Sequence, residues 1–188
     1  MKKTLKYIIL AILCTAAISC GKRYVPKPYG YVRGFIPDTA YTMFDYSGVC
    51  SFLLSNNAVV KARKDDKWSN ICYPALKATI HCSYAPVKEN LRELTDDAQE
   101  FVYNHSSIAT AISEQAYFRE KDRVYCVLYE LDGNTASPCQ FYITDSLSNY
   151  FRASVYFDCL PNRDSLQPSI DYLHTDIIRL IESFQWNK

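Results

Sequence analysis

Hydrophobic and polar positions alternate along much of the chain, as they do in β-strands whose two faces meet different surroundings. The pattern predicts strands at residues 51–54 and 58–62, paired around a Ser-Asn-Asn turn, and at 68–73 and 76–83, paired around Pro74-Ala75. A second group of strands is predicted at residues 115–119, 124–131, 139–144 and 150–158. Together they indicate an antiparallel sheet of about six or more strands.

Between the two groups of strands, the apolar residues recur every three or four positions, which is the period of a helix with one buried face. This pattern begins at Lys88 and continues to about His105. Residues 108–113 either extend the helix or begin a turn, and the pattern does not choose between them.

A second helical pattern occupies the end of the chain. Asp164 or Ser165 can cap its first free amides, Pro168 is tolerated in a first turn, and the pattern runs to about Trp186. Strands, a central helix, strands and a C-terminal helix predict an α+β domain with both helices packed on the sheet. This order of elements is similar, by analogy alone, to that of a Mog1/PsbP-like sandwich.

The first twenty residues have the pattern of an export signal. Three lysines within the first six residues precede an uncharged, mostly apolar run at 7–18, and Ser19-Cys20-Gly21 follow. The run is shorter than the ~20 apolar residues that cross a bilayer. We therefore expect residues 1–19 to be a lipoprotein signal peptide, and Cys20 to carry covalent acyl chains such as palmitate.

Two alternatives to lipidation at Cys20 are open. Cys14 is disfavoured as the lipidated residue because bulky Leu13 precedes it, and an ordinary secretory signal would leave Cys20 as a free thiol. Lipidation at Cys20 predicts a domain held in the cell envelope by its acyl chains. We expect it to face the periplasm, on the inner leaflet of the outer membrane in preference to the inner membrane.

Residues 20–48 combine the lipidated cysteine with prolines and aromatic residues, among them Pro26, Pro28, Tyr29 and Tyr31. This composition predicts an extended tether that lies on the domain, since it is too apolar for a free linker. Residues 49–188 then form a single α+β domain.

Composition excludes two classes of protein. Loss of the signal lysines takes the formal charge from +1 to −2, and no dense basic face suggests a nucleic-acid partner. Aromatic residues make up 14% of the chain and glycine is scarce, which argues against disorder.

Six cysteines remain after Cys14 and Cys20, namely Cys50, Cys72, Cys82, Cys126, Cys139 and Cys159. An even number in an oxidising compartment permits three disulfides. A hairpin turn at Asp132-Gly133 would place Cys126 opposite Cys139, but it would put Pro138 where the ladder needs an N–H group. A turn at Gly133-Asn134 avoids this loss and makes the cysteines diagonal neighbours, so we favour buried free thiols.

The sequence offers no metal or catalytic motif. His81, Cys82, Cys72, His105 and His174 are the conceivable ligands, but they lack metal-site spacing, and the adjacent His81 and Cys82 point to opposite faces of a strand. No nucleophile elbow, phosphate loop or dinucleotide motif occurs. We expect a protein that is not an enzyme and that has no metal or cofactor besides its lipid.

Long blocks of the chain resemble the gliding-motility lipoprotein family GldD of the Bacteroidota. The blocks are residues 24–31, 71–81, 123–129, 133–137 and 161–165, followed by Asp176-Ile-Ile and the segment to Trp186. The cysteines at positions 72, 82, 126, 139 and 159 depart from the family's pattern.

The resemblance implies a non-enzymatic accessory or assembly factor for gliding motility and type IX secretion, with other envelope proteins of these systems as partners. The matching candidate interaction positions are Pro26, Pro28, Tyr29 and Tyr31 in the tether, and Pro161, Asn162 and Asp164 in the loop 161–165. A purely local structural role is an equally good explanation for both segments. The prolines can stiffen the tether, and Asp164 or Ser165 can cap the C-terminal helix. The alternative function is a periplasmic ligand-binding or hydrolytic module that acts on glycan or lipid.

Overall fold

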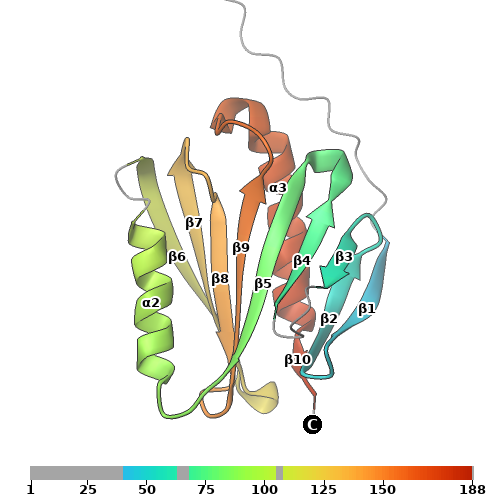
Figure 1. The fold of residues 1–188 in the computed structure, drawn as a ribbon, viewed down its shortest axis with the longest axis vertical. Coiled ribbons are helices and arrows are strands. Elements are labelled where there is room, and N and C mark those ends of the chain that lie inside the picture. Colours follow the sequence, from blue (N-terminus) through green and yellow to red (C-terminus); the bar gives the residue numbers. More distant parts are fainter. Residues whose placement is uncertain (1–39, 63–67, 105–107, 188) are drawn as a thin grey trace, which may run out of the picture.

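Most of the predicted strands join one antiparallel sheet of seven strands in the computed structural model, which describes residues 40–62, 68–104 and 108–187 (Figure 1). The strand order is β3-β4-β5-β9-β8-β7-β6. The bounds are β3 Val59–Ala62, β4 Trp68–Tyr73, β5 Ala78–Pro86, β6 Ala109–Arg119, β7 Val124–Gly133, β8 Cys139–Thr144 and β9 Asn149–Phe157. Short 3-10 helices, η1 Pro74–Leu76 and η2 Glu120–Asp122, join β4 to β5 and β6 to β7. The predicted α+β class is confirmed.

A second, smaller sheet corrects two expectations. Its strands are β1 Tyr41–Tyr46, β2 Cys50–Ser55 and β10 Gln185–Trp186. β1 therefore forms where the sequence indicated the end of the tether. The predicted hairpin of β2 with β3 is wrong, because β2 pairs with β1 and β10 while β3 pairs with β4. The turn at residues 55–57 carries the chain from one sheet to the other.

The helix α3, Arg163–Ser183, packs on one face of the large sheet, and the small sheet lies beside it, with Phe52 of β2 also contacting Phe151 of β9 (Figure 1). Leu173, Ile177 and Leu180 of the helix are almost fully buried in this main core. Phe184 follows the helix and stacks on Phe52 of β2 with ring centroids 6.0 Å apart. The burial of these large side chains joins the two sheets into one domain.

The helix α2, Leu91–Tyr103, packs on the opposite face of the large sheet. Val102 contacts Tyr129 and Leu131 of β7 in a second, smaller core. This is the predicted central helix, and His105, its expected end, lies outside the described residues. Across the described part of the chain, neither helix is both long and apolar enough to span a membrane.

Residues 109–113 form part of a strand, because β6 begins at Ala109 and pairs with β7, with one irregularity in the register between Ala109 and Ala111. Both predicted turns between β7 and β8 are wrong. The amide of Leu131 donates to the carbonyl of Pro138, so the loop is longer than two residues, and Cys126 faces Ile143. Pro138 immediately precedes β8 and only accepts a hydrogen bond, so its missing N–H group costs nothing there.

The observed register also bears on the disulfide question. Cys139 faces Glu130, four positions along the ladder from Cys126. At about 3.3 Å per residue the two cysteines are about 13 Å apart, whereas a disulfide needs Cα atoms within about 7 Å. All six cysteines in the described part of the chain are free thiols.

Candidate functional site

The start of α3 meets the β7–β8 loop in a polar junction built on Arg163. One guanidinium nitrogen of Arg163 lies 2.6 Å from the carboxylate of Asp132, and another donates to the carbonyl of Leu131 at 3.1 Å. The backbone amide of Arg163 donates to the side chain of Asn134 at 2.9 Å. Three contacts from one residue therefore fix the start of the helix to the end of β7 and to the loop that follows it. Residues 133–137 and 161–165, two of the blocks that resemble the GldD family, meet here.

The cap of α3 differs from the prediction. Asn162 is the N-cap residue, and its side-chain oxygen accepts from the amide of Ser165 at 3.2 Å. The helix begins at Arg163, so neither Asp164 nor Ser165 caps it, and Pro168 lies beyond the first turn. Asn is among the residues that favour this position, since its short side chain reaches the free amides.

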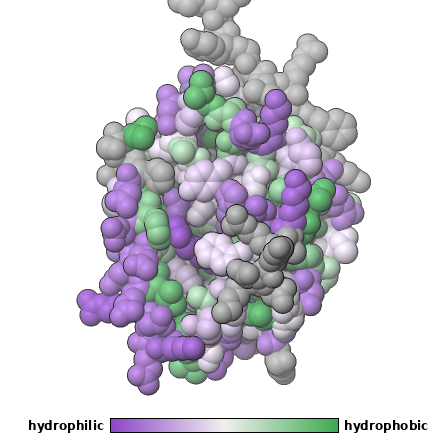
Figure 2. Space-filling view, viewed as in Figure 1, coloured by the Kyte–Doolittle hydropathy of each residue, from purple (hydrophilic) through white to green (hydrophobic). Residues whose placement is uncertain are grey.

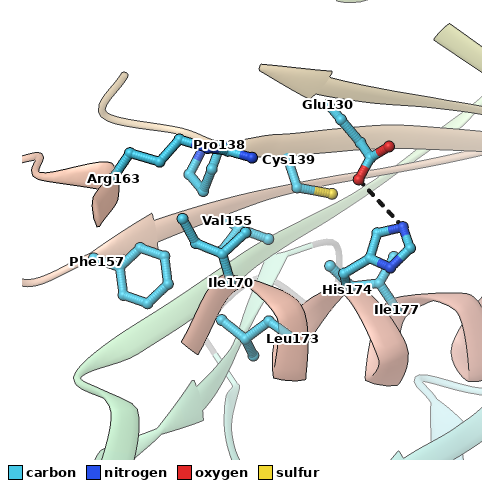
Figure 3. Close-up of a pocket in the computed structure, with 10 residues that line it drawn as sticks. All are labelled: Glu130, Pro138, Cys139, Val155, Phe157, Arg163, Ile170, Leu173, His174 and Ile177. Atoms are coloured by element: carbon cyan, nitrogen blue, oxygen red, sulfur yellow. Dashed lines mark ion pairs between the residues drawn. The ribbon is translucent and has the colours of Figure 1, made fainter. Parts of the chain in front are cut away.

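A small cavity adjoins this junction, between α3 and strands β7, β8 and β9 (Figure 3). Glu130 and Cys139 face each other across β7 and β8, and His174 approaches from α3. The imidazole Nε2 lies 3.2 Å from the Glu130 carboxylate, an ion pair when the ring is protonated, although the contact lacks hydrogen-bond geometry. The cavity volume is about 20 Å³, room for about one water molecule.

The three polar side chains of this cavity resemble the parts of a thiol nucleophile, but their environment works against that chemistry. Figure 3 shows the Cys139 thiol pointing toward the side where Glu130 and His174 meet. Burial, and then the nearby Glu130 carboxylate, raise the pKa of Cys139 above its ordinary value. A nucleophilic cysteine needs the opposite, a lowered pKa and access for substrate. The arrangement favours a protonated, buried thiol beside a polar helix contact.

The outer face of β3, β4 and β5 forms a second candidate surface. Trp68 is 50% exposed there, and the side chains of Asn70 and His81 interact across β4 and β5 at 2.9 Å. The His81 ring also packs edge-on against Tyr156 of β9. Figure 2, which views the molecule as Figure 1 does, shows hydrophobic residues scattered among hydrophilic ones, with no single large apolar patch.

The conceivable metal ligands are not brought together. His81 and Cys72 lie on the outer face of the large sheet, whereas Cys82 lies in the main core. His174 contacts Glu130 on the face of the sheet that α3 covers. His105 falls outside the described residues. Within the described ranges, no group of three or more metal-ligating side chains occurs.

The predicted site residues divide between described and undescribed parts of the chain. Cys20, Pro26, Pro28, Tyr29 and Tyr31 lie outside the described residues. Pro161, Asn162 and Asp164 lie in or beside the β9–α3 loop, where Pro161 and Asp164 are exposed and Asn162 is half-buried.

Sequence reasoning missed the central residue of that loop. Arg163 lies between the named candidates, but its partners at the end of β7 and in the β7–β8 loop are about thirty residues away in the sequence. The sequence offered one signal for this contact: residues 133–137 and 161–165 both belong to the blocks that resemble the GldD family.

The chain matches a known protein-family model. The model described as gliding motility lipoprotein GldD matches residues 21–186. A search of curated proteins finds no match. The match covers the tether positions, the Arg163 junction and the C-terminal strand.

Proposed function

Because the chain belongs to the family of gliding motility lipoprotein GldD, we propose that it is a non-enzymatic assembly or stability factor of the cell envelope. It is anchored through lipid on Cys20 and supports gliding motility, type IX protein secretion or both. The observation that carries the proposal is the match of the family model over residues 21–186, nearly all of the chain that follows the signal peptide. Membrane association follows from the lipoprotein family.

Two structural features support a role in binding proteins. β6 is an edge strand of eleven residues that pairs only with β7 within the described chain, so one side of its backbone is available to an added strand. The outer face of β3, β4 and β5 presents the exposed Trp68, and tryptophan is enriched at protein interfaces. Partner proteins of the same secretion and motility systems are the proposed occupants.

The alternative function is a ligand-binding or hydrolytic module that acts on glycan or lipid, and the Cys139 cavity gives little support to its hydrolytic form. It needs a pocket that admits substrate and a group with a pKa suited to catalysis. The cavity beside Cys139 has room for about one water molecule, and burial raises the pKa of its thiol.

The proposal is tested by deletion of the gene and complementation with wild type, Cys20→Ala or Cys14→Ala. Gliding speed and the amount of type IX cargo in the medium and periplasm are measured. We expect wild type and Cys14→Ala to restore both, because Cys14 is removed with the signal. Cys20→Ala should fail, since the protein then lacks the acyl chains that anchor it.

Labelling with a palmitate analogue provides the matched control. Cys14→Ala protein should carry the label and Cys20→Ala protein should not, at equal protein levels in the cell. Normal cargo release and normal gliding in the deletion strain would contradict the proposed function. Full rescue by unlipidated Cys20→Ala would contradict the anchor.

A further inference from the structure

A polar groove opens at the end of the domain where η2, the β8–β9 turn and β10 meet, at the bottom of Figure 1. Its volume is about 590 Å³, within the range of sites that hold small molecules. It is distinct from the Arg163 junction, which lies at the start of α3. Three separate segments of the chain therefore converge on a cavity of ligand size.

The carboxylates of the groove are already used. Asp122 lies 3.2 Å from the guanidinium of Arg119. Asp145 accepts from the backbone amides of Leu147, Ser148 and Asn149 at 2.8–2.9 Å, and from the Asn149 side chain at 2.8 Å. Both carboxylates therefore already have partners within the protein, which makes them poor binding groups for a cationic ligand.

The cations of the groove are available. Within the described ranges, neither Lys121 nor Arg123 forms an ion pair, and both residues line the groove. The Arg123 guanidinium makes a long bond of 3.3 Å to the carbonyl of Asp145, which leaves most of its donors unused. The remaining capacity therefore favours an anionic group, and guanidinium geometry suits carboxylate and phosphate.

Trp186 adds an apolar surface beside these charges. Its indole N–H donates to the carbonyl of Arg123 at 3.1 Å, and Phe184 packs edge-on against the ring, so the ring is held in place. Gln185 lines the same groove, as does Asn187, whose amide nitrogen donates to Asp45 at 2.7 Å and whose amide oxygen can still accept. A flat apolar ring next to amide donors and acceptors can contact the carbon face of a sugar while the amides bind its hydroxyls.

We propose that this groove binds an anionic sugar, that is, a sugar ring carrying a carboxylate or a phosphate. Lys121 and Arg123 bind the anionic group, and Trp186 packs against the ring. The site requires no covalent step, and it does not depend on the role proposed above in motility or secretion.

Fluorescence of Trp186 tests the proposal directly, because the chain has only one other tryptophan. A Trp68→Phe variant of the full lipidated chain in detergent is titrated with glucuronate, glucose 6-phosphate, glucose, inorganic phosphate and a glucuronate-containing oligosaccharide. We expect saturable changes with the acidic sugars, at least tenfold weaker binding of neutral glucose, and weaker binding of phosphate alone. Tighter binding of the oligosaccharide than of glucuronate would show that the groove binds an acidic sugar within a glycan. Equal binding of the two would show that it binds a free acidic sugar.

A charge-matched pair of variants completes the test. In the same background, Lys121→Gln with Arg123→Gln should weaken acidic-sugar binding at least tenfold, with an unchanged circular dichroism spectrum. The control, Lys88→Gln with Arg92→Gln, removes two exposed positive charges outside the groove and should change affinity less than twofold. Equal binding of glucose and glucuronate, equal loss in both double variants, or no saturation by either acidic sugar at 10 mM would overturn the proposal.

Discussion

The phenol of Tyr41 donates a hydrogen bond of 2.5 Å to the carboxylate of Asp176, joining two residues that are 135 positions apart in the chain. Tyr41 begins β1, and Asp176 lies in α3 with 4% of its surface exposed. Tyr73 also interacts with this carboxylate, and burial, followed by Asp176, raises the pKa of Tyr73. Burial of a carboxyl group costs free energy unless its oxygens accept hydrogen bonds, and Tyr41 supplies one to Oδ1 of Asp176. This contact therefore couples the first described strand to the last helix.

We predict that Tyr41→Phe lowers the free energy of unfolding by about 1–3 kcal/mol, because the buried carboxyl group of Asp176 loses the hydrogen bond that the phenol donates. Urea unfolding of the full chain in detergent measures the change. Tyr103→Phe is the control, since Tyr103 is 47% exposed on α2 and its change should cost less than about 0.5 kcal/mol.

The coupling itself is measured by adding Asp176→Asn alone and together with Tyr41→Phe. The double variant should be less destabilised than the two single changes predict when added, because residues in contact are not independent. Additive effects within about 0.5 kcal/mol would show that the Tyr41–Asp176 bond contributes little.

Arg163→Gln is expected to loosen the start of α3. The change removes the ion pair with Asp132 and the bond to the Leu131 carbonyl, while the backbone bond to Asn134 is retained. We expect a loss of about 0.5–2 kcal/mol in the free energy of unfolding, because the ion pair is partly exposed, and faster amide exchange in the first turns of the helix. Arg92→Gln, on the exposed surface of α2, should leave both quantities nearly unchanged. If the backbone amides of residues 163–167 exchanged at the wild-type rate in the Arg163 variant, the side chain of Arg163 would not hold the start of α3 in place.

Local patterns were sufficient for most of the fold. The alternation in β4, β5, β7, β8 and β9 and the two helical periods identified these elements because their buried faces repeat regularly. β1 was missed because its aromatic residues follow a proline-rich stretch, and because its partner β2 was assigned to a hairpin with β3. Pairing in the small sheet depends on contacts with α3, and a local pattern does not carry that information.

The candidate sites were less predictable than the fold. The loop 161–165 was identified through its resemblance to the family, but the role of Arg163 depends on a loop distant in sequence. Likewise, the groove brings Arg123 and Trp186 together across 63 positions. A polar site assembled from several turns has no repeating pattern, so only the three-dimensional structure reveals it.

Thiol reactivity should follow burial and pKa. Cys159 is exposed and Cys72 half-buried, whereas Cys139 and Cys126 are buried, and burial raises the pKa of Cys126 to about 12. We predict that iodoacetamide at pH 7.5 modifies Cys159 first and Cys72 more slowly in the native protein, with Cys139 protected until the protein unfolds. Peptide mass spectrometry at successive times measures the order, and Cys159→Ser should remove the fast phase. Rapid modification of Cys139 would instead support a nucleophilic role beside His174.

Acid should weaken the β8–β9 turn through Asp145. Burial alone would raise the pKa of this carboxyl, but the bonds from the amides of Ser148, Asn149 and Leu147 outweigh it and lower the pKa. A lowered folded-state pKa contributes stability that is present above the unfolded value of about 3.9 and is lost as the pH falls through the folded value.

Asp145→Asn keeps one acceptor oxygen but loses the charge and the bond from the Asn149 side chain. It should therefore lower the free energy of unfolding by about 1–2 kcal/mol at pH 7. The difference from wild type should shrink below about pH 4, because wild-type Asp145 then becomes protonated as well. Denaturant unfolding between pH 2 and pH 7 measures the profile, with Asp158→Asn as the control at an exposed carboxyl. A difference that stays constant across this range would show that the charge of Asp145 does not stabilise the turn.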